Sequence, residues 1–217
     1  MKNILFLIFL GFIFACTPAI NQENRIEEDA TFLASDALEG RQTGTKGEKE
    51  AATYIENRFK ELGLLPKGTN GFLQTFSFKP KTNPHDEVKF DVNGDGTIAG
   101  NNVIGFIDNK AENTIIIGAH FDHLGFGGEG SLYRDAIKAV HNGADDNASG
   151  IAVLLNLAAK LTAKNTNNNY LFMAFSGEEM GLLGSNYFVK NPTIDIKKVS
   201  YMINMDMVGR LNEENTL

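Results

Sequence analysis

Three short runs of residues that are apolar throughout most constrain the fold of this chain. They lie at residues 103–107, 114–118 and 170–175. Such runs are typical of central strands that are covered on both faces of a sheet. A helical pattern at 149–163 separates the last two runs, and a further helix and strand are expected at 179–188 and 199–206. This alternation of strands and helices predicts an α/β fold.

The residues before these runs are expected to form elements that pack around the sheet. A helix is predicted at 25–34, and a second one between Thr45 as its N-cap and Gly63 as its end. Apolar and polar residues alternate at 72–78 and 87–92, as in antiparallel strands with one exposed face. Because 42% of the 217 residues are hydrophobic and no internal repeat occurs, we expect one domain with a sizeable core.

The N-terminus has the pattern of a secretory signal peptide. Lys2 precedes an almost unbroken apolar run at 4–14, which is too short to span a bilayer and is followed by a small residue. We therefore predict that residues 1–15 are removed on export; a buried core strand is the alternative. The next residue is Cys16, and the sequence that ends there resembles the lipobox of bacterial lipoproteins.

This resemblance implies a lipid on the thiol of Cys16, a tether at 16–24 and a mature domain at 25–217. The protein would be exported and either periplasmic or anchored in the outer membrane, with the lipid as its only membrane contact. An ordinary signal peptide followed by an incidental cysteine is the alternative. The formal net charge is −7 and no basic patch with interleaved aromatic residues occurs, so no nucleic acid partner is expected.

Acidic and histidine side chains gather where the predicted strands end. The four clusters lie at 120–123, 143–147, 176–179 and 204–206. Open α/β sheets bind their ligands at such an edge, and carboxylates that abut buried strands need a counter-charge. Because no lysine or arginine lies within these clusters, we expect a metal ion rather than ion pairs. Imidazole and carboxylate donors without a thiolate favour zinc in a catalytic site.

Each cluster has an ordinary structural explanation when it is taken alone. His120 could simply end a strand. Glu178 and Glu179 could stabilise a helix N-terminus, and residues 145–147 could cap one. The four clusters together favour a metal site. Adjacent Glu178 and Glu179 cannot point the same way, so one is expected to bind metal and the other to transfer a proton.

The clusters belong to motifs that resemble the aminopeptidase Y family of co-catalytic zinc peptidases, which includes bacterial leucyl aminopeptidases. The motifs are G-A-H-F-D-H from Gly118, N-G-A-D-D-N-A-S-G from Asn142, S-G-E-E-M-G-L-L-G-S from Ser176 and N-M-D-M from Asn204. Their order and spacing match over 113–209, and 31–64 resembles the N-terminal region of exported bacterial members. The resemblance implies a zinc-peptidase (phosphorylase/hydrolase-like) fold with a central mixed, mostly parallel, twisted sheet flanked by helices.

The same resemblance implies a role for each residue of the site. The metal ligands would be His120 and Asp206 for one zinc, Glu179 for the other, and Asp145 as the bridge between the two. Asp122 would orient the imidazole of His120 from behind. Glu178 would be the general base that takes a proton from the zinc-bound water as it attacks the peptide carbonyl.

The family's fifth ligand is a histidine after the aspartate that corresponds to Asp206, and no histidine follows Asp206 in this sequence. His85, His123 and His141 precede it and match no ligand motif. We therefore expect the fifth ligand, the last strand and the final helix to lie beyond the end of this chain. The zinc site at Glu179 is accordingly expected to be incomplete.

The predicted function is an aminopeptidase that removes N-terminal residues from peptides outside the cytoplasm. One alternative is a non-catalytic binding domain on the same fold, as in transferrin-receptor-like relatives. Another is a glutaminyl cyclase, a class of enzyme that shares the fold and binds a single zinc. The presence of Glu178 and of four ligand positions favours the peptidase.

Overall fold

The computed structural model describes residues 22–80, 87–128, 131–135, 137–164 and 167–210. The predicted signal peptide and Cys16 lie outside these residues. Helix α1 (Gln22–Leu33) begins within the expected tether at 16–24, so the end of that segment is helical. Within the described residues, every helix is too short or too polar to cross a bilayer.

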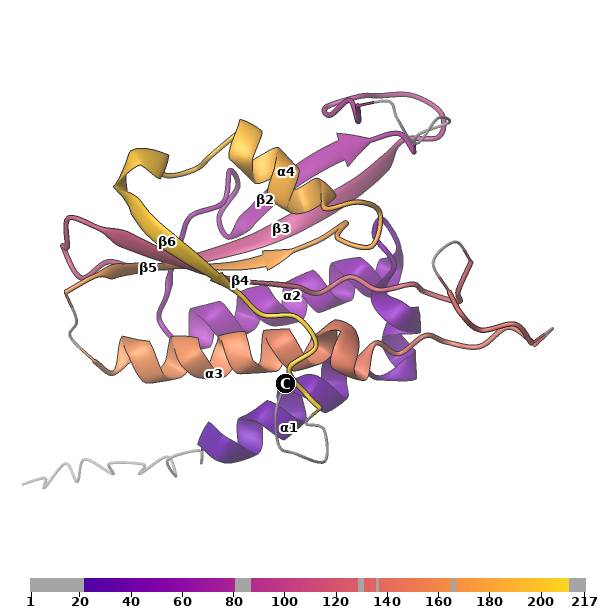
Figure 1. Ribbon diagram of the computed structural model, residues 1–217, viewed down its shortest axis with the longest axis horizontal. Coiled ribbons are helices and arrows are strands. Elements are labelled where there is room, and N and C mark those ends of the chain that lie inside the picture. The colour runs from indigo at the N-terminus through magenta and orange to yellow at the C-terminus, as the bar shows by residue number, and fades with distance from the viewer. Residues whose placement is uncertain (1–21, 81–86, 129–130, 136, 165–166, 211–217) are drawn as a thin grey trace, which may run out of the picture.

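The centre of the molecule is a sheet with the strand order β1-β3-β5-β4-β6, in which β2 also pairs with β3 (Figure 1). Its described strands are β1 (Leu65–Pro66), β2 (Leu73–Phe78), β3 (Ile98–Ile107), β4 (Thr114–His120), β5 (Asn169–Phe175) and β6 (Val199–Asn204). β4 runs parallel to β5 and β6, whereas β3 runs antiparallel to β1, β2 and β5.

Among the described strands the sheet is therefore mixed, as expected, and only β3 runs against the direction of the other strands. The connections explain the difference. β4 and β5 are joined through α3 (Gly150–Thr162), and β5 and β6 through α4 (Leu183–Lys190). Crossovers that contain a helix let the two strands they join run in the same direction. No described helix lies between β2 and β3 or between β3 and β4.

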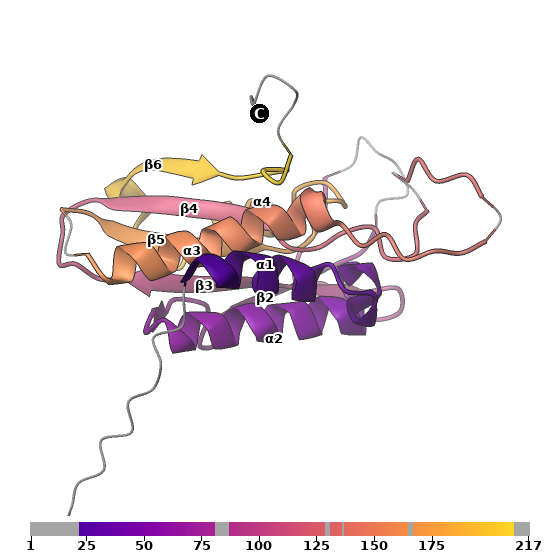
Figure 2. The same ribbon diagram turned by 90° about the horizontal axis from the view of Figure 1, so that it is seen from below.

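Helices cover both faces of the sheet (Figures 1 and 2). α1, α2 (Lys46–Glu61) and α3 lie on one face, and α4 lies on the other. The side chains of the central strands alternate between two buried clusters, with Val103, Ile117 and Phe172 on the side of α1 to α3 and Ile104, Ile116 and Met173 on the side of α4. Burial on both faces explains why these strands are apolar throughout, which confirms the α/β fold expected from the sequence.

The predicted helices are confirmed, with small changes at their ends. The side chain of Thr45 accepts a hydrogen bond from the backbone N–H of Glu48 at 3.4 Å, so it caps α2 as expected. On the inner face of α2, the side chains of Ala51, Ile55 and Phe59 are fully buried against the sheet and α3. This stripe fixes the helix on the sheet.

The strand expected at 87–92 is not formed as a regular element. Phe90 makes a single antiparallel bridge with Phe78. The apolar residues of this segment instead pack on the aromatic cluster that joins β2 to α4, where the Phe90 ring lies 5.2 Å from the ring of Tyr187. The alternating pattern thus reflects packing of side chains without a ladder of backbone hydrogen bonds.

The helix expected at 179–188 begins only at Leu183. The preceding residues form a turn in which the backbone N–H groups of Gly181 and Leu182 donate to the carbonyl of Glu178, at 2.8 and 2.9 Å. Gly181 has a positive φ of 103°, a conformation that favours glycine. This turn is the part of the fold that carries both glutamates of the predicted site.

Candidate metal centre

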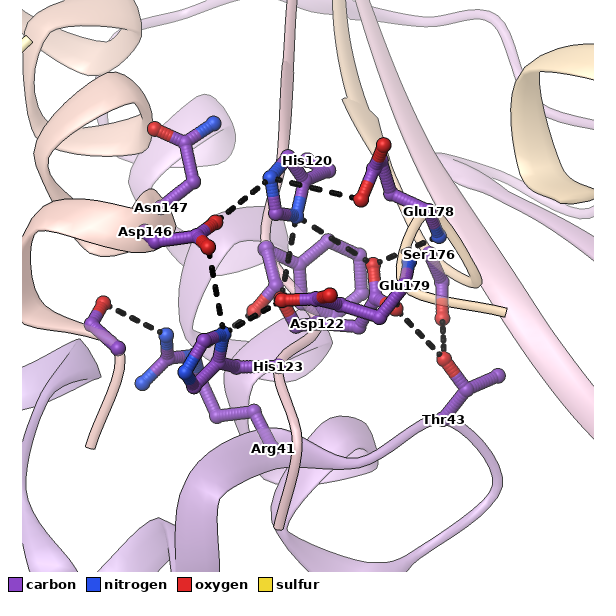
Figure 3. Close-up of polar contacts among 12 residues, drawn as sticks. Arg41, Thr43, His120, Asp122, His123, Asp146, Asn147, Ser176, Glu178 and Glu179 are labelled. Carbon is purple, nitrogen blue, oxygen red and sulfur yellow. Dashed lines mark hydrogen bonds and ion pairs between the residues drawn. The ribbon is translucent and has the colours of Figure 1, made fainter. Parts of the chain in front are cut away.

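The predicted clusters meet at one edge of the sheet, where β4, β5 and β6 end (Figures 1 and 3). His120 is the last residue of β4, Glu178 and Glu179 lie in the turn after β5, and Asp206 follows β6. The short segment Ala144–Ser149 leads into α3 and brings an acidic pair to the same edge. Because these three strands are parallel, their carboxyl ends lie together, where open α/β sheets place their ligands.

Three carboxylates converge on one nitrogen of His120. Its Nε2 atom lies 3.2 Å from Oδ1 of Asp146 and 3.3 Å from Oδ1 of Asp206. Oε2 of Glu178 is further away, at 3.9 Å. The ligand atoms of His120, Asp146 and Asp206 lie within 4.8 Å of one another, close enough to hold a metal ion.

A second group forms around His123, a residue that matches no ligand motif in the sequence. Its Nδ1 atom lies 2.6 Å from Oε1 of Glu179 and 4.0 Å from Oδ2 of Asp146. The two carboxylate oxygens of Asp146 therefore face different histidines, as Figure 3 shows. Asp146 is shared by both groups of candidate ligands.

Asp145, which was expected to bridge two ions, points elsewhere in the structure. Its Oδ1 atom accepts a hydrogen bond from the backbone N–H of Gly209 at 2.9 Å, and its Oδ2 atom lies 3.4 Å from Nε of Arg210. Asp146 has an extended backbone, with φ −105° and ψ 90°. The two side chains of the pair point in different directions, so Asp146 faces the histidines and Asp145 does not.

Asp122 is fully buried and lies on the Nδ1 side of His120, with its Oδ1 atom 3.7 Å from that nitrogen. Its carboxylate also holds the turn after β5. Oδ1 accepts from the backbone N–H of Glu178 at 3.1 Å, and Oδ2 accepts from that of Glu179 at 3.3 Å. The hydroxyl of Thr43 donates to Oδ2 at 3.1 Å. Nδ1 of His120 lies 3.1 Å from the backbone oxygen of Asp122. Asp122 thus contacts the histidine through its backbone and holds both glutamates through its carboxylate.

The electrostatics of the site reflect the excess of carboxylates. Burial opposes charge on the His120 imidazole, but the Asp122 and Asp146 carboxylates outweigh it and raise its pKa to about 11. Burial also raises the pKa of Glu178, opposed by His120 and reinforced by Asp122 and other carboxylates. Without a metal, a proton on His120 therefore supplies positive charge that these carboxylates require.

Arg41 lies beneath the site and is fully buried, although no pattern in the sequence indicates a role for it. Its guanidinium donates to the backbone carbonyls of Phe121 and Asn142, each at 2.7 Å, of Gly143 at 3.1 Å, and of Leu33. Burial lowers its pKa to about 10, and the nearby carboxylates of the site oppose that shift. Arg41 therefore joins the loops that carry His120 and Asp146, and it adds positive charge close to them.

The loop that carries Arg41 requires glycine at position 40. Gly40 has a positive φ of 70°, and a Cβ atom there would lie 2.5 Å from the backbone oxygen of Gly125. No pattern of hydrophobicity predicts this close approach, so the role of the Glu-Gly-Arg sequence becomes apparent only in three dimensions.

Replacing Arg41 by methionine is expected to lower the free energy of unfolding by about 3 kcal/mol, because several buried carbonyls lose their charged donor. Urea denaturation followed by circular dichroism measures this change. Arg134→Met is the matched control, since Arg134 is exposed and donates within its own loop, to the backbone oxygen of Ser131. Equal stabilities of the two variants would show that Arg41 does not hold the loops together.

A pocket of about 510 Å³ lies beside the second group of ligands. His123, Glu179 and Asp122 form part of its wall. The apolar side chains that line it include Phe78, Val88, Met180 and Leu183. A ligand that reaches Glu179 can therefore place an apolar group in a cavity next to the candidate metal centre.

Two groups of nitrogen and oxygen donors that share one aspartate, with Glu178 beside them, are suited to metal-assisted hydrolysis. Residues 102–217 match peptidase family M28, and the chain belongs to this family. It is 38% identical over 120 residues to a probable leucine aminopeptidase of Trichophyton verrucosum, a match that covers 52% of this chain and 30% of that protein. The chain spans less than half the length of such curated relatives.

Solved structures share the fold. A glutaminyl cyclase of Bacteroides thetaiotaomicron superposes with a TM-score of 0.67 at 18% identity, over 90% of this chain and 64% of that one. A Zn-dependent exopeptidase of Parabacteroides distasonis superposes with a TM-score of 0.65 at 20% identity, over 88% of this chain and 63% of that one. At such low identity the likeness concerns the fold alone.

Proposed function

We propose that this chain carries the catalytic site of a zinc-dependent aminopeptidase that removes N-terminal residues from peptides. The observation that carries the proposal is the pair of ligand groups that share Asp146, with a glutamate beside them. Membership of peptidase family M28 and the names of the fungal relatives support the same reaction.

The donor set fits zinc. It combines imidazole nitrogens with carboxylate oxygens and contains no thiolate, as is usual in catalytic zinc sites. One ion would be held by His120, Asp146 and Asp206, and a second by His123, Asp146 and Glu179. This assignment replaces Asp145 by Asp146 as the bridging ligand. Zinc, when bound, lowers the pKa of water and stabilises negative charge on the peptide carbonyl oxygen.

Glu178 is the general base of this proposal. Its side chain is about one-third exposed, so water and substrate can reach it, and its Oε2 atom lies 3.9 Å from Nε2 of His120. The carboxylate takes a proton from the water whose oxygen bonds to the carbonyl carbon. It then gives this proton to the nitrogen of the leaving peptide as the C–N bond breaks. The bonds from Asp122 to the backbone hold Glu178 in position during both steps.

The apolar pocket supports a preference for peptides whose first side chain is apolar, because it opens next to Glu179. Hydrolysis of leucyl-p-nitroanilide by the purified full chain tests the reaction. We expect activity that is lost with a chelator and restored by zinc. A protein that binds zinc but hydrolyses none of a panel of aminoacyl anilides would contradict the proposal.

The same preparation tests the two other functions. The likeness in fold to a glutaminyl cyclase favours a parallel assay in which a glutaminyl peptide is offered for cyclisation. Cyclisation without anilide hydrolysis would assign the site to that reaction. If the protein binds no zinc and turns over neither substrate, the chain would belong with the non-catalytic binding domains.

We also propose that the protein is exported and that residues 1–15 are removed. Cys16 then carries a lipid. The mature protein is either periplasmic or anchored by this lipid in the outer membrane. The support is the short apolar run at 4–14 and the cysteine directly after it. Mass spectrometry of the N-terminal peptide from cells tests the proposal, since an unprocessed Met1 would contradict it.

A further inference from the structure

Asn147 follows directly after the shared ligand Asp146, and its side chain is turned away from that of Asp146 (Figure 3). The residue has no exposed surface. Its Nδ2 atom donates to the backbone carbonyl of Met205 at 3.0 Å, and its Oδ1 atom accepts from the backbone N–H of Met207 at 3.3 Å. One buried amide therefore bonds to the backbone on both sides of the candidate ligand Asp206.

The segment that carries Asp206 is bonded to the start of α3 at further points. The side chain of Asp206 is 45% exposed and follows β6, whose residues are mostly exposed. The N–H of Val208 donates to the hydroxyl oxygen of Ser149 at 3.1 Å. The N–H of Gly209 donates to Oδ1 of Asp145 at 2.9 Å, an acceptor that asparagine would keep. Side chains at the start of α3 thus place the ligand that follows β6.

The pair of bonds around Asp206 requires an amide on a short side chain. An amide offers both a donor and an acceptor, whereas a carboxylate only accepts. Oδ1 of Asn147 also accepts from the backbone N–H of Gly150 at 3.0 Å, in the manner of a helix cap. A Cβ atom at position 150 would lie 2.3 Å from this Oδ1 atom. Gly150 therefore leaves the room that the amide occupies.

We propose that Asn147 is a positioning residue, which holds Asp206 opposite Asp146 and so completes the ion site that contains His120. The inference rests on the proposed function, because zinc is the ion of that proposal. The amide bonds to three backbone groups, so it acts on zinc only through the placement of Asp206. Capping of α3 accounts for the bond to Gly150, but not for the two bonds beside Asp206.

Asn147→Ser separates these two uses of the side chain. Serine caps a helix about as well as asparagine, but it is too short to bond to the backbone on both sides of Asp206. Zinc affinity of the full chain is measured by competition with a chromophoric chelator, in a Glu179→Gln background that leaves the group with His120 intact. We expect binding to weaken by about 10- to 100-fold, the usual cost of losing a group that orients a metal ligand.

A second background shows whether the effect is specific to Asp206. In His120→Ala, zinc binding reports the group of His123, Asp146 and Glu179, which does not include Asp206. Asn147→Ser is expected to leave the affinity of this group unchanged. A general loosening at the start of α3 would weaken zinc equally in both backgrounds, because both groups share Asp146. Equal losses, or no loss in either background, would overturn the inference.

Gly150→Ala tests the same amide without changing it. Alanine favours a helix more than glycine does, but its Cβ atom would displace the Oδ1 atom of Asn147. In the Glu179→Gln background we therefore expect weaker zinc binding, as with Asn147→Ser. Asn186→Ser is the matched control, because Asn186 is exposed on α4. It is expected to bind zinc as tightly as its background does.

Hydrogen exchange in the zinc-free full chain separates this inference from the proposed function. The N–H groups of Met207, Val208 and Gly209 are all bonded to side chains at the start of α3. We expect them to exchange about 10-fold faster in Asn147→Ser, as measured by mass spectrometry. If they do so in a chain whose wild type binds no zinc, the proposed function fails and the positioning by Asn147 stands. If exchange is unchanged, the inference fails, whatever the zinc affinity.

Discussion

Replacing Glu178 by glutamine is expected to lower kcat for the hydrolysis of leucyl-p-nitroanilide by about 10³-fold while bound zinc is retained. An amide has nearly the same shape as the carboxylate but cannot take a proton from water. Glu178 lies outside both groups of candidate ligands, so its loss should leave the metal in place. Steady-state kinetics and the zinc content of the same preparation test both parts of this expectation.

Glu27→Gln is the control for this variant, because Glu27 is exposed on α1. The pH profile gives a further check. Because burial raises the pKa of Glu178, the wild type should lose activity as the pH falls and the carboxylate takes up a proton. Glu178→Gln should show no such acid limb. A turnover within a few-fold of the wild type would remove Glu178 from the role of general base.

Replacing Asp146 by asparagine is expected to weaken zinc binding by more than about 100-fold. Loss of a residue that only hydrogen-bonds to a metal ligand typically weakens binding by up to about 100-fold, and loss of a shared ligand should weaken it more. The two oxygens of this carboxylate face His120 and His123, so both candidate sites lose a charged donor. Zinc content after dialysis against a weak chelator, measured by atomic emission, tests the expectation. Hydrolysis should fall together with the bound metal.

Asp145→Asn is the matched control, since the neighbouring carboxylate bonds to Gly209 and lies near Arg210 instead of facing the histidines. We expect it to retain zinc. If Asp145→Asn loses the metal and Asp146→Asn keeps it, the bridging role belongs to Asp145, as the motif alone suggested. The zinc-bound form would then differ from this structure at the start of α3.

Much of the fold could be predicted because it follows from local patterns of burial. The strands at 114–118 and 170–175 are apolar throughout, and a helix with one apolar stripe leaves little choice of which face it buries. The alternation of apolar and polar residues at 87–92 led to a wrong prediction of a strand. Side chains that pack on an aromatic cluster produce the same sequence pattern as a half-exposed strand. Strand direction depended on which connections contain a helix.

The candidate site could be predicted as a region but not atom by atom. The clusters at strand ends meet because parallel strands end together. Whether Asp145 or Asp146 faces the histidines depends on the backbone conformation at Asp146. No pattern in the sequence indicates this conformation. Arg41 is also beyond its reach, because it is distant in sequence from the loops of the site that it joins.

The turn after β5 ties together two tasks that could have been separate. Asp122 accepts hydrogen bonds from the backbone N–H groups of both Glu178 and Glu179, so a single peptide unit sets the spacing between the proposed base and a proposed ligand. A metal of different size that pulled on Glu179 would also shift Glu178. Metal preference and proton transfer should therefore change together under substitution, and exchange of the ion cannot tune one without disturbing the other.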